Sequence, residues 1–174
     1  MKRDELEHVL RAAGAITGVS TWVIIGSQAI LGALPDAPED LLVSQEVDVY
    51  APDDEAASDL VDGSIGEKSP FHESFGYYGH GVGPETAILP SRWRERAVAI
   101  QSPSTGGVTG ICPAPSDLAI SKIAAWREKD REFVRALLRH GIVTLADLRA
   151  RLSELEPEMA QRIEARLRSV ESAR

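Results

Sequence analysis

The amino-acid sequence predicts an α+β protein, in which a small mixed sheet flanked by helices is followed by a C-terminal helical segment. Short β-branched or alternating runs at 22–25 and 44–50 are separated by connections rich in Gly, Pro and Asp. Beyond Pro115, apolar residues recur at helical spacing. With 43% hydrophobic and 26% charged residues, the composition is that of an ordinary globular protein, and the length of 174 residues fits one domain, or one domain with a small helical extension.

The first third of the chain predicts a helix, a strand, a tight turn and a second helix. Residues 4–17 place apolar side chains at helical spacing, with acidic residues in the first turn. Residues 22–25, Trp-Val-Ile-Ile, predict a strand that ends at Gly26-Ser27 and leads into a compact helix at 28–31.

The middle of the chain predicts the remaining strands of the sheet. Residues 44–50 alternate as a half-buried strand does, so that Glu46 and Asp48 share one face. A polar helix is expected over 53–61 and a further strand over 71–80. Residues 81–90 have the composition of a loop, and the short β-branched runs at 97–100 and 108–111 predict a hairpin.

The C-terminal part predicts helices throughout. Ser116 or Asp117 can cap a helix that includes Lys122 and Trp126. Lys122, Trp126 and Lys129 are spaced to lie on one face of this helix. We therefore expect a core at 1–112 and a helical segment at 113–174, which packs on the core and completes the functional site.

Several classes of protein are disfavoured by the sequence. No apolar run has the roughly 18 to 20 residues of a membrane span, and the N-terminus lacks the apolar region of a signal peptide, so we expect a cytoplasmic protein. Cys112 is the single cysteine, which excludes an internal disulfide, and there is no Cys/His cluster with zinc spacing. The net charge of -8 argues against broad adhesion to nucleic acid, although a local group of arginines can still form a basic face.

The order of two small motifs indicates phosphoryl-transfer chemistry. Glycine permits close backbone approach to a phosphate, and Gly26-Ser27 lies between a strand and a helix. Mg²⁺ in nucleotide sites is held by one or two carboxylates, which Glu46 and Asp48 can supply from one strand face. Each motif alone is common, but together they predict a metal–triphosphate site.

In these motifs the chain resembles the polymerase-β-like nucleotidyltransferases, over roughly residues 20–140. Within that superfamily it is most similar to the AbiEii and MenT type toxins and their DUF6036-type relatives. The residues that carry this closer resemblance are Ser44-x-Glu46-x-Asp48, Asp117-Leu-Ala-Ile-Ser-Lys122 and Arg127-Glu-Lys129-Asp130. Glu46 departs from the family's usual Asp, and the spacing from Gly-Ser to the acidic pair is longer than in compact members.

The resemblance implies a set of site residues. The residues that it casts as catalytic are Glu46, Asp48, Lys122 and Asp130, and Glu46 and Asp48 also hold the metal. The residues that it casts as nucleotide-binding are Gly26, Ser27, Ser44, Lys122, Arg127 and Lys129. A third acidic residue on a following strand, the general base of many members, is not evident. Asp130 can replace it, with Glu85 and His80 as weaker candidates.

The resemblance also implies an activity. It is Mg²⁺-dependent transfer of a nucleoside monophosphate from an NTP to an acceptor hydroxyl, with a tRNA 3′ end as the acceptor. The resemblance further implies that the protein is the toxin of a toxin–antitoxin pair, and the cognate antitoxin would be a protein partner. The alternatives are transfer to a small molecule such as an aminoglycoside, transfer to a protein side chain, or a degenerate relative that binds a nucleotide or a partner without turnover.

Two further groups of residues have both a functional and a structural interpretation. Tyr77, Tyr78 and Trp93 can stack on a nucleobase or belong to the core. Arg92, Arg94 and Arg96 can present a basic edge to RNA, or protect the edge of a sheet.

Overall fold

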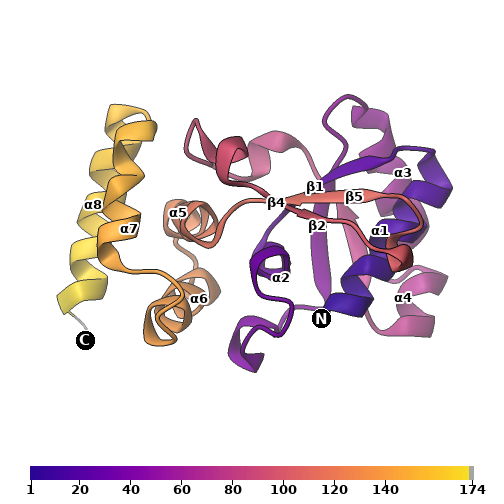
Figure 1. Cartoon of the computed structure of the whole chain (residues 1–174), viewed down its shortest axis with the longest axis horizontal. Helices are drawn as coiled ribbons and strands as arrows, with labels where there is room; N and C mark the ends of the chain where they lie inside the picture. The colour runs from indigo at the N-terminus through magenta and orange to yellow at the C-terminus, as the bar shows by residue number, and fades with distance from the viewer. Residues whose placement is uncertain (173–174) are drawn as a thin grey trace.

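The computed structural model describes residues 1–172 and shows an α+β fold whose sheet has helices on one face and a helical segment beyond one end (Figure 1). The strands are β1 (Thr21–Ile25), β2 (Glu46–Tyr50), β3 (Tyr78–Gly81), β4 (Val98–Ile100) and β5 (Thr109–Cys112). The α-helices are α1 (Arg3–Thr17), α2 (Ile30–Ala33), α3 (Glu55–Ile65), α4 (Pro70–Phe75), α5 (Pro115–Ala125), α6 (Glu128–Arg139), α7 (Leu145–Ala150) and α8 (Pro157–Ser172). The 3₁₀ turns are η1 (Ser27–Ala29), η2 (Glu39–Leu41), η3 (Pro84–Thr86), η4 (Trp93–Arg96), η5 (Pro103–Thr105) and η6 (Leu152–Glu154).

The sheet is mixed, with strand order β3-β2-β1-β5-β4. The central strand β1 pairs antiparallel with β2 and parallel with β5, while β3 is parallel to β2 and β4 is antiparallel to β5. The register places Asp48 opposite both Ile25 and His80. The end of β1, the acidic strand β2 and the short strand β3 therefore meet at one place in the sheet.

The two faces of the sheet bury different residues because side chains alternate along a strand. On one face, Ile24, Val47 and Val49 belong to the main core cluster together with residues of α1 and α3. On the other face, Ile25, Tyr50 and Trp93 belong to a smaller cluster. Glu46 and Asp48 alternate with Val47 and Val49, so they lie on the face away from α1 and α3.

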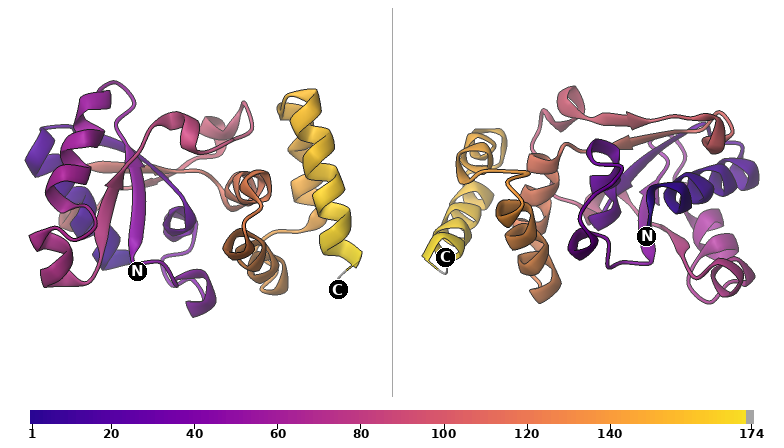
Figure 2. Two further views of the ribbon diagram at one scale, coloured as in Figure 1. Left: turned by 180° about the vertical axis from the view of Figure 1, so that it is seen from behind. Right: turned by 60° about the horizontal axis from the view of Figure 1, so that its bottom comes forward.

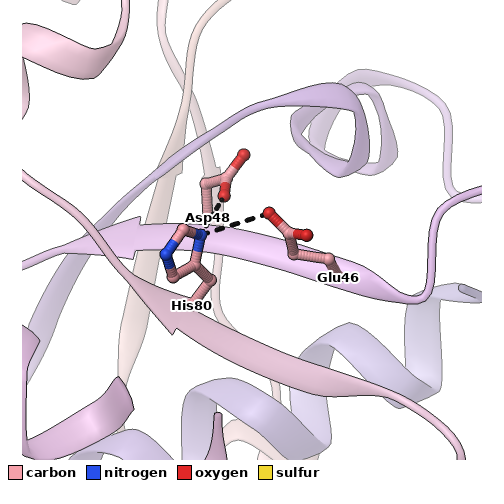
Figure 3. Close-up of side chains that lie close together, drawn as sticks. All are labelled: Glu46, Asp48 and His80. Carbon is pink, nitrogen blue, oxygen red and sulfur yellow. Dashed lines mark hydrogen bonds and ion pairs between the residues drawn. The ribbon is translucent and has the colours of Figure 1, made fainter. Parts of the chain in front are cut away.

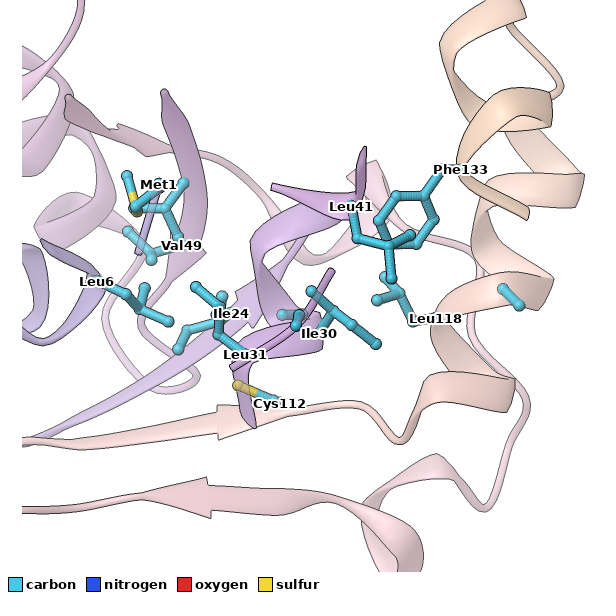
Figure 4. Packing of buried hydrophobic residues seen from close by; sticks show 14 of the residues in the cluster. Met1, Leu6, Ile24, Ile30, Leu31, Leu41, Val49, Cys112, Leu118 and Phe133 are labelled. Carbon is cyan, nitrogen blue, oxygen red and sulfur yellow. The ribbon is translucent and has the colours of Figure 1, made fainter. Parts of the chain in front are cut away.

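The C-terminal helices share the main core with the sheet. Leu41 and Phe133 in the same cluster join η2 to α6, and Figure 4 shows this packing continuing from Leu6 and Ile24 through Ile30 to Leu118. Helices α7 and α8 pack on α5 at the end of the molecule where the described chain terminates (Figure 2). Strand β5 ends at Cys112 and α5 begins at Pro115, which is where we placed the boundary between core and helical segment; that division stays a prediction.

The predicted fold class is confirmed: a small mixed sheet is flanked by helices and followed by a helical segment. The predicted hairpin at 97–100 and 108–111 is the antiparallel pair β4–β5, connected through η5. The predicted helix at 4–17 and strands at 22–25 and 44–50 correspond to α1, β1 and β2.

Two predicted elements are wrong. The strand expected over 71–80 is instead the helix α4 followed by the short β3, because Ser69 caps a helix whose first residue is Pro70 and Gly76 ends it at φ 76°. The single helix through Lys122, Trp126 and Lys129 is broken, because Trp126 takes a left-handed conformation, φ 59°, after α5. Lys122 and Lys129 therefore belong to different helices.

Among the described residues, none of the helices combines the length and the apolar character that crossing a membrane requires.

Candidate active site

A pocket of about 600 Å³ lies between the sheet and the first two C-terminal helices. Its sheet side is formed by the end of β1, by β2 and by His80 of β3, and its helical side by α5, α6 and the turn between them. The residues that line it are Ile25, Gly26, Ser27, Asp40, Leu41, Val43, Ser44, Glu46, Asp48, His80, Thr86, Ala87, Ser121, Lys122, Ala125, Arg127, Lys129, Glu132 and Phe133. All the residues predicted to bind metal or nucleotide are in this set. Asp130, which was predicted to be catalytic, does not line the pocket.

Gly26 ends β1 in a conformation that only glycine adopts readily, with φ 76° and ψ -174°. The space beside it is also taken, since a Cβ at this position would overlap Oδ2 of Asp48. Gly26 is therefore required both by the backbone and by the carboxylate next to it. Ser27 follows as the first residue of η1, so the Gly-Ser pair opens a short 3₁₀ turn that continues into α2.

Glu46, Asp48 and His80 form a cluster of possible metal ligands, with ligand atoms that all lie within 4.8 Å of one another. His80 Nδ1 lies 3.2 Å from Glu46 Oε1 and 3.0 Å from Asp48 Oδ1. Figure 3 shows the imidazole reaching both carboxylates from the neighbouring strand. Tyr78 donates a hydrogen bond of 2.9 Å to the second oxygen of Glu46. These two side chains of β3 hold the acidic pair in place.

The two carboxylates influence each other's protonation strongly. Burial raises the pKa of Asp48 to about 6, and the hydrogen bond and negative charge of Glu46 act in the same direction. Burial also opposes ionisation of Glu46, but hydrogen bonds from Asp48 and Tyr78 and the charge of His80 outweigh it, so that its pKa is lowered. Burial lowers the pKa of His80, but the hydrogen bond and charge of Asp48 outweigh it, and the net shift is upward. The one positive charge of a protonated His80 thus leaves part of the negative charge of the two ionised carboxylates unbalanced.

This donor set fits a divalent cation. Two partly buried carboxylates lie on alternate residues of one strand, and burial together with the neighbouring Glu46 raises the pKa of Asp48, which is an arrangement that a cation would stabilise. The carboxylate oxygens suit Mg²⁺, while a coordinating imidazole is more usual for transition metals. Glu46 and Asp48 are therefore the residues that fit Mg²⁺, and His80 orients them through its hydrogen bonds.

Three cationic side chains face this cluster across the pocket. Lys122 on α5 is buried, and its Nζ lies 3.5 Å from Oδ1 of Asp130 and 5.7 Å from the centre of the Phe133 ring. Arg127 precedes α6 and is 60% exposed. Lys129 is on the first turn of α6 and is also exposed. Burial lowers the pKa of Lys122, against the opposing charges of Asp130 and Asp48.

Asp130 is buried behind the pocket wall, where it holds two of these cations. Its Oδ2 accepts a 2.7 Å hydrogen bond from Nε of Arg127 and a 3.1 Å bond from the Arg127 backbone N–H, and its Oδ1 pairs with Lys122. Burial would raise the pKa of Asp130, but the bond from Arg127 and the charge of Lys122 lower it overall. Its predicted catalytic role stays a prediction. In this structure its contacts are with Lys122 and Arg127.

Ser44 lines the pocket, but its hydroxyl is used locally. Its Oγ accepts a 3.1 Å hydrogen bond from the backbone N–H of Glu46, and its carbonyl accepts one of 3.1 Å from Nε2 of the buried Gln28. Ser44 therefore links the start of β2 to η1, and its predicted contact with the nucleotide stays a prediction.

His80 and Tyr78 are more central than the sequence analysis expected. His80 was a weaker candidate for the general base, and Tyr78 was considered only for stacking or for the core. The signal that identifies them is the parallel β2–β3 register, which sets Tyr78 beside Glu46 and His80 beside Asp48.

The other aromatic and basic residues singled out from the sequence have structural contacts. Trp93 is buried in the smaller cluster, and Tyr77 hydrogen-bonds His8. Arg96 pairs with the buried Asp117 at 2.8 Å and with Glu154 at 2.7 Å. Arg96 thereby ties η4 to α5 and η6.

The fold and the pocket define a class of protein: a mixed-sheet α+β protein in which an acidic strand beside a Gly-Ser turn faces cations across one pocket, as in nucleotidyltransferases. The family model described as "Nucleotidyltransferase of unknown function (DUF6036)" matches residues 4–171. The chain belongs to this family, and the sequence resemblance is confirmed at this level. Comparison with curated proteins and with solved structures gives no match.

Proposed function

We propose that this protein is a metal-dependent nucleotidyltransferase that transfers a nucleoside monophosphate from an NTP to an RNA hydroxyl. The observation that carries the proposal is the pairing of opposite charges across one pocket. Glu46 and Asp48 lie on the sheet side, Lys122 and Arg127 on the helical side, and the Gly26-Ser27 turn is part of the same wall. A metal–triphosphate needs ligands for the cation and for the phosphates at one site, and this pocket offers both.

Each wall has a separate task in this proposal. Gly26 and Ser27 approach the triphosphate closely, and Lys122, Arg127 and Lys129 bind its oxygens. Glu46 and Asp48 hold Mg²⁺, which when bound neutralises charge on the triphosphate. The acceptor oxygen then forms a bond to the α-phosphorus as the bond to the β-phosphate oxygen breaks, and pyrophosphate leaves with that electron pair. The acceptor's proton goes to a general base.

The geometry favours His80 among the three candidates for that base. His80 lines the pocket and is 45% exposed, whereas Asp130 lies behind the pocket wall and Glu85 is not among the lining residues. His80 also contacts both carboxylates, so a proton taken up there stays next to negative charge.

A basic row on α6 supports a polynucleotide acceptor. Arg127, Arg131, Arg135 and Arg139 recur every four residues, beginning at the pocket. Residues 113–174 carry twelve Lys and Arg against ten Asp and Glu, whereas residues 1–112 carry seven against seventeen. A phosphate backbone would therefore meet the C-terminal helices rather than the acidic core. With the family resemblance, this supports a tRNA 3′ end as the acceptor.

A cationic small molecule is less well supported. It would need acidic side chains beyond those that hold the metal, and the pocket offers Asp40 and Glu132. Asp40 is already compensated by Arg139 and His140. The incubation with labelled NTP and tRNA distinguishes RNA transfer from the alternatives, which are aminoglycoside transfer, protein modification and nucleotide binding without turnover.

Resemblance to the AbiEii and MenT type toxins supports a further part of the proposal, which is that the protein is a toxin whose activity is neutralised by a cognate antitoxin. Modification of a tRNA 3′ end would stop aminoacylation, and its expected site of action is the cytoplasm. Expression of the intact chain should then inhibit growth, and expression of a form without activity should not.

The test is incubation of purified protein with Mg²⁺, each α-phosphate-labelled NTP in turn, and total bacterial tRNA, followed by a denaturing gel. Labelled tRNA with the unaltered protein, and none with Asp48→Ala, is the expected result. Label in a small molecule or in protein would change the acceptor. Nucleotide binding without transfer to any acceptor would indicate a degenerate enzyme.

A further inference from the structure

The turn that carries the pocket's cations has an unusual residue at its centre. Trp126 ends α5 with φ 59° and ψ 23°, a left-handed conformation in which helices most often place glycine. A bulky residue there is strained unless its surroundings hold it. Lys122 lies one turn before Trp126 and Arg127 directly after it, and both line the pocket.

Arg166 of α8 holds this turn from the side away from the sheet. Its Nη1 donates hydrogen bonds of 2.8 Å to the carbonyl of Ile123 and 2.7 Å to that of Ala124. These carbonyls belong to the last turn of α5, where no following helical N–H is available to them. A cation is also the favoured partner for a helix C-terminus.

The same guanidinium lies against the indole of Trp126. The Arg166 carbon Cζ is 5.3 Å from the ring centre, and that of Arg131 on α6 is 5.9 Å from it, both within the range of a cation–π contact. Trp126 thus joins three helices: it ends α5, and its ring is contacted from α6 and from α8. The contacts account for a tryptophan in a position that glycine would occupy without strain.

Helix α8 is itself anchored. Ile163, Leu167 and Val170 are buried in the main cluster, and they place Arg166 on the side that faces α5. Arg162, one turn earlier on the same helix, is 48% exposed and pairs with Glu158 at 3.4 Å. The two arginines share one helix and differ in what they touch, so Arg162 is a matched control for Arg166.

We infer that Trp126 and Arg166 are positioning residues for the phosphate-binding cations Lys122 and Arg127. This inference rests on the proposed function, because it concerns how the helical wall of that pocket meets a triphosphate. It makes α8, which contributes no residue to the pocket, a determinant of nucleotide affinity. We call the contacts of Arg166 with Trp126 and with the two carbonyls the clamp. Among the described residues, no hydrogen bond, ion pair or ring contact joins Trp126 or Arg166 to β2 or β3, so loss of the clamp should affect the cationic wall alone.

The variants are Arg166→Ala, the control Arg162→Ala, and Arg166→Lys, which restores a cation able to donate to the two carbonyls. Trp126→Gly removes the ring and accepts the positive φ, whereas Trp126→Ala removes the ring and keeps the strain. Inorganic tripolyphosphate probes the cations by calorimetry, and Mn²⁺ alone probes the acidic wall. Transfer kinetics with Mg²⁺–NTP separate KM from kcat. All of these measurements are made well below the melting temperature of each variant.

Arg166→Ala should raise the Kd for tripolyphosphate and the KM for NTP by about tenfold with kcat nearly unchanged, as expected for lost binding that is equal in ground and transition states. Mn²⁺ affinity should not change, Arg162→Ala should match the parent, and Arg166→Lys should recover part of the loss. Both Trp126 variants should lose phosphate affinity, and Trp126→Gly should melt higher than Trp126→Ala.

Three outcomes would overturn the inference. If Arg166→Ala binds tripolyphosphate as the parent does while the parent transfers nucleotides, the clamp is structural only, and the proposed function stands. If the parent itself binds no tripolyphosphate, the cations do not serve phosphates, and the inference fails together with the proposed function. A fall in Mn²⁺ and phosphate affinity to the same extent would also contradict it, since it would show a general loss of structure.

Discussion

The two walls of the pocket are built in different ways. On the sheet wall, Glu46, Asp48 and His80 are held by strand pairing, and their neighbours are fixed by the β2–β3 register. On the helical wall, Lys122 and Arg127 flank a left-handed turn, and the carbonyls before it are held by Arg166, which lies 43 and 42 positions further along the chain. The acidic wall therefore depends on local pairing, and the cationic wall depends on the packing of three helices.

The walls also differ in what stabilises them. On the sheet wall, burial raises the pKa of Asp48 and the neighbouring Glu46 raises it further, so the charged form of Asp48 is disfavoured without a cation. On the helical wall, the buried Asp130 pairs with Lys122 and Arg127, so removal of either cation leaves a buried carboxylate less well compensated. Removal of a charged side chain from the sheet wall should therefore stabilise the protein, whereas removal of one from the helical wall should destabilise it.

Asp48→Asn should have the largest effect on activity. Loss of a metal ligand removes several kcal/mol of transition-state stabilisation, and transfer should fall by about a thousandfold or more. When a chelator keeps the site free of metal, the pKa of Asp48 in the folded state is raised from 3.8 to about 6. The contribution of Asp48 to the free energy of unfolding is therefore complete below pH 3.8 and is lost as the pH rises through 6. At pH 8 the variant should therefore melt higher than the parent.

Melting curves in EDTA at pH 5 and pH 8 measure this difference, with the exposed Asp59→Asn of α3 as the matched control. A variant that melts no higher than the parent at pH 8 would mean that ionisation of the buried Asp48 beside Glu46 does not destabilise the fold.

Lys122→Met should reduce transfer by about a hundredfold, as is typical when a donor aimed at developing charge is removed. It should also lower the melting temperature, in contrast to Asp48→Asn, because Asp130 stays buried with only Arg127 beside it. Steady-state kinetics and thermal unfolding measure both effects. Lys68→Met, on the loop before α4 and outside the pocket lining, is the control. A stabilised Lys122→Met protein would remove the proposed difference between the walls.

Gly26→Ala should reduce both stability and activity. Residues with a Cβ are essentially excluded from the conformation of Gly26, φ 76° and ψ -174°, and here the Cβ also overlaps Oδ2 of Asp48. We expect a melting temperature lower by several degrees and weaker Mn²⁺ binding. Gly18→Ala, at φ 75° and ψ -1°, has a left-handed conformation that a Cβ tolerates better and no atom near its Cβ, so it should lose less stability. Equal losses in the two variants would mean that neither the Gly26 backbone nor the carboxylate adds a cost.

Arg135→Ala should have the smallest effect, limited to the acceptor. Arg135 is exposed on α6 beyond the pocket lining, so NTP affinity should not change. Loss of one phosphate contact should raise the KM for tRNA a few-fold and reduce the slope of log KM against log salt by about 1. Arg168→Ala on α8 is the control, and an unchanged salt slope for Arg135→Ala would exclude α6 as the RNA surface.

The sheet wall was predictable from the sequence to a greater extent than the helical wall. Strand alternation placed Glu46 and Asp48 on one face, and the run at 22–25 ended correctly at Gly26-Ser27. His80 was underrated because its register with Asp48 joins strands thirty-two residues apart, a pairing that no local pattern encodes. The strand expected over 71–80 was wrong because the Ser69-Pro70 helix start outweighed the aromatic, β-favouring composition that follows.

The sequence predicted which residues form the helical wall but not the backbone conformation that brings them together. Lys122 and Lys129 do line one pocket, yet the continuous helix face that was expected to join them does not exist. Helical spacing runs unbroken through Trp126, and a tryptophan gives no local signal of a left-handed turn. The break depends on Arg166 and on the packing of α8, which are contacts of high sequence separation.

The contact between Gly26 and Asp48 makes these two positions epistatic. Because the overlap at Gly26 is with the Asp48 side chain, the effect of an alanine at 26 depends on which residue stands at 48. In an Asp48→Gly background, the steric part of the cost disappears and only the backbone part is left, so the double variant should be more stable than the two single changes predict by addition. Once the Asp48 carboxylate is lost, the neighbouring glycine is no longer needed to make room for it.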